Sequence, residues 1–374
     1  MFGKVLIANR GEIALRIIRA CRELDIASVV VHSTADADSL PVRLADEAVC
    51  IGPGPAGRSY LNIANIISAA QIRGVDAIHP GYGFLAEDKF FAEICERYHF
   101  TFIGPNSEVI AQMANKVAAR EAMSEAGLPV LPGTHESLLN AEAALEAAAE
   151  LGYPVMIKAA GGGGGRGMHL VKSETELMQS FENAQREARA AFGNDDLYLE
   201  KYLPHCRHVE IQVLADRARA IHLGDRDCSI QRRHQKIIEE APSPALPVEV
   251  RSRIGRDAVR GAEGIGFVSA GTLEFLVDDE GQHYFLEMNT RIQVEHGISE
   301  MISGMDIVKA QILIAAGEMP EMRQEAVELR GHAIECRVNA ESGTEFRPAT
   351  GQVGTLELPG GPGIRVDTHL FSGY

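Results

Sequence analysis

The chain has 374 residues, and at about 150 residues per domain this length predicts two or three domains. A composition of 45% hydrophobic and 24% charged residues is ordinary for a soluble globular enzyme. The net charge of −16 argues against nucleic acid or an anionic membrane as a partner, although a local basic pocket could still hold a small anion. No apolar run approaches the roughly 20 residues of a membrane helix, and six scattered cysteines suggest reduced thiols, so we expect a cytoplasmic protein.

The first 110 residues alternate between strand and helix patterns. Short apolar runs predict strands at residues 4–9, 28–32, 48–51, 77–79 and 101–103. Helical spacing of apolar residues predicts helices at 12–24, 60–72 and 89–97. This alternation predicts a doubly wound parallel sheet. Its first turn, Asn9 to Glu12, lacks the G-x-G-x-x-G fingerprint, so we do not expect dinucleotide binding there.

A run of glycines at 161–165 and 167 is the most distinctive local feature. It follows a linker at 129–133 and an Ala-rich helix predicted at 138–151, and strands predicted at 154–159 and 168–172 flank it. No helix follows the loop directly and no Gly-Lys-Ser/Thr ends it, which excludes the Rossmann and Walker A patterns. We interpret it as a hairpin whose backbone N–H groups close over phosphates, with Lys158 adding a charge. The alternative is a flexible hairpin without a ligand.

Residues 272–277 and 284–291 alternate between apolar and polar positions, which predicts two paired strands. Period two places Glu287, Asn289 and Arg291 on one face of the second strand. A two-residue turn at 280–281 would then place Glu274 directly opposite Glu287. A three-residue turn would shift this register.

Two carboxylates in this position repel each other. At ~5 Å and an effective dielectric constant of ~20, the repulsion between Glu274 and Glu287 is roughly 3 kcal/mol. A divalent cation between them reverses the sign, and two carboxylates with the Asn289 amide oxygen suit Mg²⁺ or Mn²⁺ carrying nucleotide phosphates. The alternative is a pair of solvated glutamates on an exposed edge.

A cationic stretch contrasts with the acidic composition of the chain. Its members are Arg226, Arg232, Arg233, His234 and Lys236, with no acidic residue between 228 and 238. It is either a solvated face or an anion site. Arg337 is a further candidate cation, for which an internal ion pair with Glu335 or Glu341 is the commoner outcome.

Arg291, Gln293 and Glu295 would share a face if their strand continues. A carboxylate beside a guanidinium group can deprotonate a small anion that the guanidinium holds. Glu295 is therefore a candidate base.

The combined motifs resemble the biotin carboxylase family of ATP-grasp enzymes. The resemblance runs from residue 3 to the end, and it rests on residues 79–87, 158–168, 200–203, 207–212, 231–236 and 287–296. The organisation is most similar to stand-alone biotin carboxylase subunits of bacterial acetyl-CoA and other acyl-CoA carboxylases.

The resemblance implies a nucleotide site and a metal site. ATP would be held by Lys116, Lys158, the loop glycines Gly163, Gly164 and Gly165, Glu200, Lys201, Tyr202, Leu203, His208, His234, Glu274 and Glu287. Glu200 and the backbone of residues 201–203 would meet the adenine. Mg²⁺ or Mn²⁺ would lie at Glu274, Glu287 and Asn289, in agreement with the carboxylate argument.

The resemblance also implies the chemistry. Bicarbonate would be held by Lys236, Arg291, Gln293 and Val294, while Glu295 removes its proton. The carbonate would attack the γ-phosphate of ATP and give carboxyphosphate and ADP. Carboxyphosphate would break down to CO₂ and phosphate, and the phosphate would take the ureido proton of biotin. Arg337 would stabilise the biotin enolate electrostatically, with Tyr82 also at the biotin. Lys236, Arg291, Glu295 and Arg337 are thus the catalytic candidates.

The implied architecture is an α/β chain whose ATP-grasp part is α+β. We expect an N-terminal domain at 1–112, an ATP-grasp domain at 113–325 and part of a β-rich C-terminal domain at 326–374. A small mobile lid at about 130–203 would carry the glycine hairpin and close over ATP.

Two features depart from the family pattern. Family members usually read Glu-His-Pro after the base, whereas Gly297 and Ile298 follow His296 here. This glycine would free the backbone, and we expect looser substrate binding. The chain also stops at Tyr374, where the family's C-terminal lobe normally continues, so it is either a fragment or completed by another polypeptide.

The chain contains no Met-Lys-Met attachment site, so biotin is expected on a separate carrier protein. A carboxyltransferase component and a homodimer are the other expected partners. Two alternatives remain open at this point. One is another ATP-grasp ligase, forming a carboxylate–amine bond or carbamoyl phosphate, and the other is a truncated, non-catalytic partner subunit.

Overall fold

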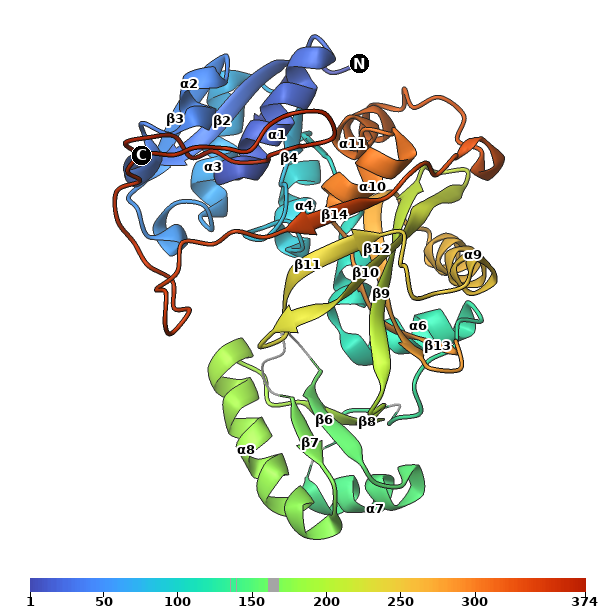
Figure 1. Ribbon diagram of the computed structural model, residues 1–374. Coiled ribbons are helices and arrows are strands. Elements are labelled where there is room, and N and C mark those ends of the chain that lie inside the picture. Colours follow the sequence, from blue (N-terminus) through green and yellow to red (C-terminus); the bar gives the residue numbers. More distant parts are fainter. Residues whose placement is uncertain (135, 139, 161–167) are drawn as a thin grey trace.

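The computed structural model describes residues 1–134, 136–138, 140–160 and 168–374. Within these residues the chain forms three sheets of five, three and six strands (Figure 1). Short 3₁₀ helices lie at Thr34–Asp36, Ala56–Arg58 and Gln324–Ala326. Among the described residues, no helix combines the length and apolar character needed to span a membrane.

The N-terminal unit is built on a parallel sheet with the order β3-β2-β1-β4-β5. Its strands are β1 (Lys4–Ile7), β2 (Ala27–Ser33), β3 (Glu47–Gly52), β4 (Ala77–His79) and β5 (Thr101–Phe102). Its helices are α1 (Gly11–Glu23), α2 (Leu40–Leu44), α3 (Ile63–Arg73), α4 (Lys89–Arg97) and α5 (Ser107–Ala114). The predicted doubly wound sheet is confirmed. Helix α3 begins later than predicted because the Asn62 side chain accepts a hydrogen bond from the Asn65 N–H at 3.1 Å and caps it.

The strand order reverses between β1 and β4, and loops leave both strands at the carboxyl edge of the sheet. Asn9 joins these loops, since its amide donates to the carbonyls of Pro80 at 2.7 Å and Tyr82 at 2.8 Å. In doubly wound folds such a switch point is where a ligand crevice forms. Tyr82 and Glu12 meet there through a hydrogen bond from the tyrosine hydroxyl.

A small unit stands apart from the other two (Figure 1, bottom). Its antiparallel sheet has the order β7-β6-β8, and helices pack against it. The elements are α7 (Ala141–Leu151), β6 (Val155–Ala159), β7 (His169–Val171), α8 (Glu174–Phe192) and β8 (Leu197–Lys201). The strands predicted on either side of the glycine run are β6 and β7, and they pair. The glycines Gly163, Gly164 and Gly165 themselves lie outside the described residues.

The central unit is a six-stranded sheet with the order β13-β12-β9-β10-β11-β14. Its strands are β9 (Cys206–Ala215), β10 (Ala220–Arg232), β11 (Gln235–Ala241), β12 (Ser269–Asp278), β13 (His283–Asn289) and β14 (Ala333–Cys336). The remaining helices are α6 (Lys116–Glu125), α9 (Val248–Gly264), α10 (His296–Ser303) and α11 (Ile307–Ala316). Alternation along β9 sends Val209, Ile211 and Val213 into an apolar core shared with α6 and α9. The residues between them therefore face the opposite side.

The hairpin of β12 and β13 confirms the predicted pairing of Glu274 with Glu287 but not the predicted turn. Three residues, 279–281, form the turn, with Asp278 N–H donating to Gln282 at 2.9 Å and Gly281 at φ +77°. This turn shifts the register by one residue. A bulge between Glu274 and Phe275 shifts it back, because it leaves Leu286 without a partner on β12. The two offsets cancel before the carboxylates.

The second strand was expected to continue through Arg291, but β13 ends at Asn289. The reason is a competing hydrogen bond, because the next backbone N–H, that of Thr290, donates to the Glu87 carboxylate at 3.1 Å. The backbone N–H of Thr290 is thus bonded to a side chain of the N-terminal unit and is not available for strand pairing.

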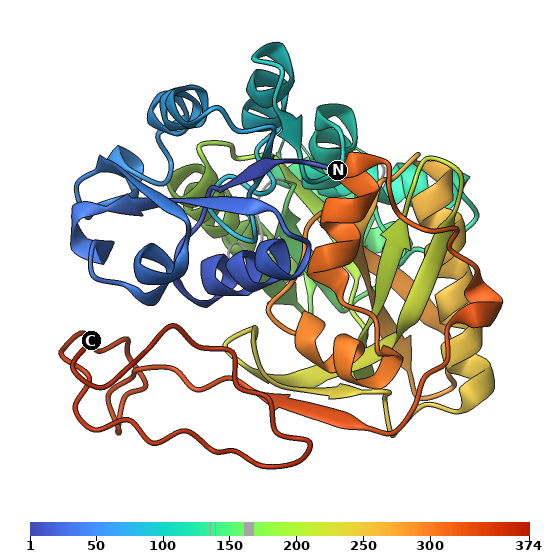
Figure 2. The same ribbon diagram turned by 90° about the horizontal axis from the view of Figure 1, so that it is seen from above.

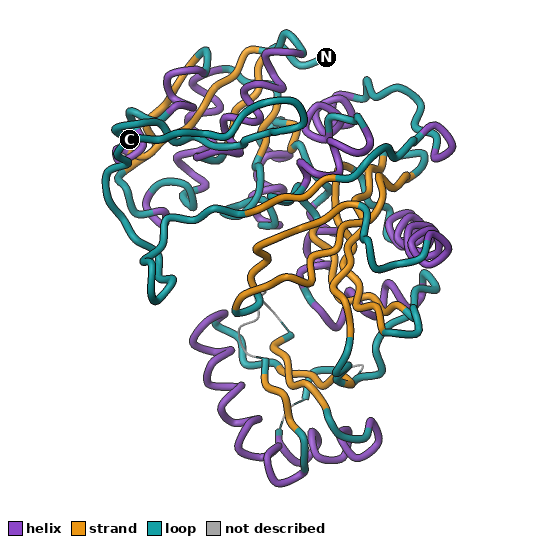
Figure 3. Tube along the Cα trace, viewed as in Figure 1, coloured by secondary structure: helices purple, strands orange, loops and turns teal. Residues whose placement is uncertain are grey.

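The C-terminal residues add strand β14 to the edge of the central sheet, beside β11. Residues 337–374 then run as loops, drawn in teal in Figure 3, with an isolated bridge between Glu341 and Pro348. Figure 2 shows these loops beside the N-terminal unit. Arg43 lies over the Phe371 ring, 4.5 Å from its centroid, so contacts of this kind tie the end of the chain to the N-terminal unit.

The separate core of the small unit leads to a stability prediction. Phe181 on α8 is only 1% exposed within that core, so Phe181→Ala should cost about 3–5 kcal/mol. The loss should be local, and hydrogen exchange should accelerate in residues 141–201 while the N-terminal sheet keeps its protection. Met178→Ala on the same helix, at a side chain 42% exposed, is the matched control. Equal effects of the two substitutions would contradict the prediction.

Candidate active site

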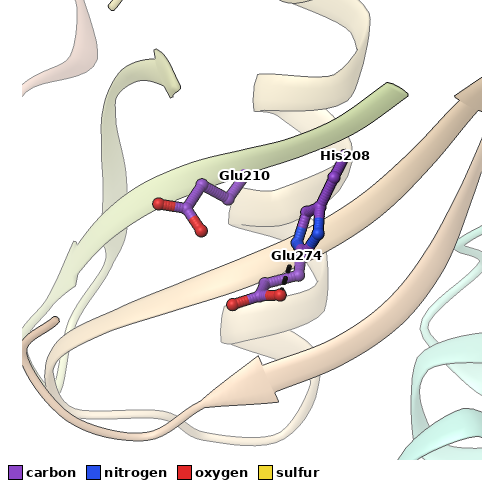
Figure 4. A group of neighbouring side chains, drawn as sticks. All are labelled: His208, Glu210 and Glu274. Atoms are coloured by element: carbon purple, nitrogen blue, oxygen red, sulfur yellow. Dashed lines mark hydrogen bonds and ion pairs between the residues drawn. The ribbon is translucent and has the colours of Figure 1, made fainter. Parts of the chain in front are cut away.

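The polar face of the central sheet carries the candidate site. His208, Glu210 and Gln212 alternate with the core residues of β9, and Glu274 faces them from β12. Figure 4 shows His208 and Glu274 turned toward each other, with Glu210 beside them. The His208 Nε2 lies 2.5 Å from the Glu274 carboxylate, and ligand atoms of all three residues lie within 4.8 Å of one another. The sheet therefore concentrates negative charge at one point.

Arg226 on β10 is the buried counterion of this face. Its Nε donates to Glu210 at 2.5 Å, and its other donors reach Gln212, Ser299, Thr272 and Gln293 at 2.8 to 3.1 Å. All five guanidinium donors are thereby used inside the protein. Of the predicted cationic stretch, Arg226 is thus a structural ion and is not free to bind a substrate anion.

Lys236 on β11 lies among three carboxylates. Its ammonium group donates to Glu210, to Glu274 at 2.8 Å and to Glu295 at 2.8 Å. Burial alone would lower the pKa of Lys236, but the three carboxylates hold it well above its usual value. Lys236 is therefore a permanent cation at the centre of the site.

Glu295, the predicted base, is the N-cap residue of α10. One carboxylate oxygen accepts from Lys236 and the other accepts from Arg337 at 2.8 Å. Burial opposes ionisation, yet Lys236, Arg337 and Arg226 lower the pKa of Glu295 to about 2. The carboxylate is ionised and ready to take a proton once a substrate draws away one of its cations.

Arg337 forms internal ion pairs, but not with Glu335 or Glu341, the partners named as the alternative to a role in the site. Arg337 donates to Glu239 at 2.7 Å and to Glu295, while Glu341 is held by Arg232 at 2.6 Å. The pairing of β14 with β11 explains the difference, since it brings Arg337 past Glu239 toward the site. Arg337 thus contacts the candidate base Glu295, which lies 42 residues earlier in the chain.

Arg291 and Gln293 join the site although their strand ends before them. Arg291 donates to Glu87 at 2.8 Å and to the Asn289 side-chain oxygen at 2.9 Å. Gln293 donates to Glu274 at 2.9 Å, and the backbone carbonyl of Val294 lies beside His296. A turn into α10, and not a continued strand, therefore brings these residues together.

Glu274 and Glu287 also lie beside cations of the protein itself, which the sequence argument did not include. Glu287 accepts from Lys116 at 2.8 Å, while Glu274 accepts from Lys236 and from the Asn289 amide at 2.8 Å. Burial would raise the pKa of Glu274, but Lys236 and His208 hold it well below its usual value. The protein's own cations thus lie at both carboxylates and reduce their repulsion. The carboxylate oxygens still suit Mg²⁺ or Mn²⁺, which would displace some of these contacts.

The predicted nucleotide residues lie where the small unit meets the central one. Glu200 on β8 accepts from Lys158 on β6 and from Arg120 on α6 at 2.7 Å. Burial raises the pKa of Glu200, but Lys158 and Arg120 lower it by more. The pKa therefore lies below its usual value, and the carboxylate is ionised. Lys116 begins α6, one helical turn before Arg120. Lys116, Lys158 and the buried carboxylate of Glu200 therefore lie close together.

Other predicted nucleotide residues are arranged differently. The ammonium group of Lys201 donates to the Gly152 carbonyl at 2.7 Å, which turns it into the small unit. The Tyr202 N–H donates to the Pro154 carbonyl at 3.3 Å, and Leu203 follows β8 in an irregular segment. His234 is exposed in the turn between β10 and β11 at φ +62°.

Sequence reasoning assigned no role to Arg120, Glu210 or Glu239. A signal existed for two of them, because Arg120 lies four residues after Lys116 on one helix face and Glu210 alternates with His208. Glu239 acquires its position only through the pairing of β11 with β14, which no local pattern indicates.

The saturated environment of Arg226 predicts a large stability effect. Arg226→Met should destabilise the fold by about 3–5 kcal/mol, because it leaves Glu210 buried with half of its ionic compensation. Arg207→Met is the control, since Arg207 is half-exposed and contacts Asp227 at 3.3 Å, and it should cost under about 1 kcal/mol. Urea unfolding of both variants measures the difference. Equal midpoints would contradict the assignment of Arg226 as a structural ion.

Comparison with protein-family models gives two matches. Residues 1–110 match the N-terminal domain of biotin carboxylase. Residues 115–322 match the ATP-binding domain of the carbamoyl-phosphate synthase L chain.

Among curated proteins, biotin carboxylase of Nostoc sp. is 56% identical over 375 residues, covering 100% of this chain and 84% of that protein. Biotin carboxylase 1 of Bacillus subtilis is 53% identical, with the same coverage. Among solved structures, a Campylobacter jejuni biotin carboxylase complex with β,γ-ATP has a TM-score of 0.98 at 47% identity, covering 100% of this chain and 84% of that one.

A second solved structure adds ligands to the comparison. The biotin carboxylase domain dimer of Hydrogenobacter thermophilus 2-oxoglutarate carboxylase was solved with MgADP, ADP and bicarbonate. It has a TM-score of 0.97 at 50% identity and covers 100% of this chain and 83% of that one. Full-length identity above 50%, the matched fold and the arrangement of the site agree: the chain belongs to the biotin carboxylase family of ATP-grasp enzymes.

Proposed function

We propose that this chain catalyses the ATP-dependent carboxylation of biotin with bicarbonate, the first half-reaction of an acyl-CoA carboxylase. The observation that carries this proposal is the position of Glu295, ionised and buried, with Lys236 and Arg337 each at 2.8 Å. The cations can hold a small anion beside the base, and the base can then remove its proton.

Lys236, Arg291, Gln293 and the backbone of Val294 would hold bicarbonate. Binding of this anion would compete for the cations that depress the pKa of Glu295, so the carboxylate becomes a better base when its substrate is present. Glu295 then takes the bicarbonate proton, and the carbonate attacks the γ-phosphate of ATP with release of ADP. Carboxyphosphate breaks down to CO₂ and phosphate within the site.

Nucleotide binding would involve Lys116, Lys158, Glu200, His208 and His234, the backbone of residues 201–203 and the glycines at 163–165. Glu274, Glu287 and Asn289 would hold Mg²⁺ or Mn²⁺, which when bound neutralises charge on the phosphates. The donor chemistry fits, because two carboxylates and an amide face one another from paired strands. The MgADP and bicarbonate reported for the Hydrogenobacter thermophilus relative support this reading.

Biotin would lie near Arg337 and Tyr82. Phosphate from carboxyphosphate takes the ureido proton, and Arg337 stabilises the enolate that attacks CO₂. The small unit, as a lid, would close over ATP and exclude water from carboxyphosphate. A biotin carboxyl carrier protein would deliver biotin, and a carboxyltransferase would use the product. The homodimer and the cytoplasmic location expected from the sequence stay predictions.

One assay separates this proposal from its alternatives. ATP cleavage is measured with bicarbonate, in the presence and absence of free biotin. Biotin-stimulated, bicarbonate-dependent release of ADP supports biotin carboxylation. ATP cleavage at the same rate with and without biotin would favour another ATP-grasp ligase. The match to the ATP-binding domain of carbamoyl-phosphate synthase is the reason to test this alternative. No cleavage would favour a non-catalytic partner subunit.

The assigned base gives a direct test. Glu295→Gln removes the proton acceptor and should reduce bicarbonate-dependent ATP cleavage on the order of 10²-fold or more. ADP binding, measured by calorimetry, should be unchanged. Glu240→Gln is the control, because this carboxylate pairs with His332 on the edge of the same sheet. Full turnover by the Glu295 variant would refute the role of the base.

Gly297 lies in the first turn of α10 without a positive φ, so its backbone is less free than the sequence suggests. A Cβ added there would meet neighbours at 3.6 to 3.7 Å, an ordinary contact, and proline is tolerated in a first turn. Gly297→Pro should stabilise the fold by about 0.4–1 kcal/mol. If this ordering acts on bicarbonate binding, the KM for bicarbonate should fall roughly two- to fivefold.

Thermal unfolding and bicarbonate titration measure the two effects of Gly297→Pro. An unchanged or higher KM would show that the glycine does not loosen substrate binding.

A further inference from the structure

Two glutamates face each other beside Arg337. Glu239 on β11 is paired directly with Glu335 on β14, and Glu239 is fully buried. Directly opposed residues of antiparallel strands have Cβ atoms about 4.5–5.5 Å apart, and two like charges there destabilise the sheet. Something must compensate or remove one of these charges.

Arg337 compensates only part of this charge. Its Nε donates to one oxygen of Glu239 at 2.7 Å, and its Nη2 donates to Glu295 at 2.8 Å. The second oxygen of Glu239 is buried and has no hydrogen-bond partner among the described residues. An ionised carboxylate with one buried oxygen unpaired is costly, whereas a protonated oxygen there can donate to the facing Glu335.

The charge balance around Arg337 points the same way. In the network that joins Arg226, Lys236 and Arg337, these three cations face five carboxylates, namely Glu210, Glu239, Glu274, Glu295 and Glu335. The other cations of the site, Lys116, Arg291 and His208, lie against Glu287, Glu87 and Glu274 and leave Glu239 and Glu335 to Arg337. The proposed substrates, bicarbonate and ATP, are anions. Each further ionised carboxylate beside Arg337 would therefore weaken their binding.

Several elements contribute charge to the pair. The titratable and charged groups that act on the pair are Arg337, Glu295 at α10, Glu210 on β9, Arg226 on β10 and Tyr82 on the N-terminal unit. Arg365 lies close by, since it and Glu335 are both 3.6 to 3.7 Å from the position of a Cβ added at Gly297, and Glu12 is hydrogen-bonded to Tyr82. Burial raises the pKa of Glu239 to about 7, with Arg337 opposing. Burial, and then Glu239, raise the pKa of Glu335 to about 8. These directions agree with the geometry.

We propose that Glu239 and Glu335 share one proton at neutral pH, and that this proton makes Glu239 a positioning residue that leaves the charge of Arg337 available to Glu295 and to biotin. The inference rests on the proposed function and extends it to residues with no contact to the substrates. At a pH above the range in which the pair loses its proton, both carboxylates are ionised. Arg337 is then attracted to Glu239 and Glu335, and its charge is less available to Glu295 and to biotin.

The test follows the pH dependence of kcat/KM for biotin in four proteins. In the wild type, the value should fall as pH rises through about 7 to 8, the range in which the pair loses its proton. Glu239→Gln removes the carboxylate that contacts Arg337 and leaves only Glu335 to titrate, so the fall should become smaller and move to lower pH. Glu335→Gln removes the like charge opposite Glu239 and leaves burial as the main cause that keeps Glu239 protonated, so the fall should move to lower pH. Glu240→Gln, one residue away and paired with His332, should keep the wild-type profile.

A spectroscopic measurement makes the test independent of turnover. Infrared difference spectra should show a protonated carboxyl band that disappears over the same pH range in the wild type and is lost or shifted in the Glu239 and Glu335 variants. Unchanged profiles and an unchanged band in both variants would overturn the proposal. Glu335→Gln carries the test alone if Glu239→Gln does not fold, because Glu335 is only partly buried. A wild type without biotin-dependent turnover that still shows the band would reject the proposed function and retain the shared proton.

Discussion

The contact of Lys236 with three carboxylates is the interaction on which the site depends. It joins Glu210, Glu274 and Glu295 through one ammonium group, and these residues come from two strands and the start of a helix. Arg226, His208 and Arg337 supply further compensation, one to each carboxylate. Without one cation at this point, the polar face of the sheet could not keep its glutamates ionised while buried. The same cation links the proposed metal ligand Glu274 to the proposed base. Binding a substrate anion here therefore changes both groups at once.

The fold was largely predictable because local patterns dictate it. Alternating strands and helices gave the N-terminal sheet, and period two in β12 and β13 gave the pair of strands. The predicted opposition of Glu274 and Glu287 holds because the longer turn and the bulge cancel. The small sheet around the glycines could be located from its flanking apolar runs. What failed was turn chemistry, since a three-residue turn and a bulge depend on a single Gly281 and on packing that spacing does not report.

The site was predictable as a set of residues, mostly through family resemblance, but not as a network. The partners of Arg337 could not be read locally, because they are set by the pairing of β11 with β14 across nearly 100 residues. The contribution of Lys116 to the charge balance of Glu274 and Glu287 was missed for a similar reason. Lys116 approaches Glu287 from a helix 171 positions earlier in the chain. Long-range charge pairing is decided by topology, which a motif does not contain.

The bulge at Leu286 separates the carboxylates from the tip of their hairpin. A deletion of one tip residue would normally slide a strand and turn its side chains to the opposite face. Here the strand can lose the bulge at Leu286 when one tip residue is deleted, and Glu274 then stays opposite Glu287. The hairpin is thereby a place where chain length can drift during evolution without loss of the acidic pair. Length variation at its tip would then carry no information about activity.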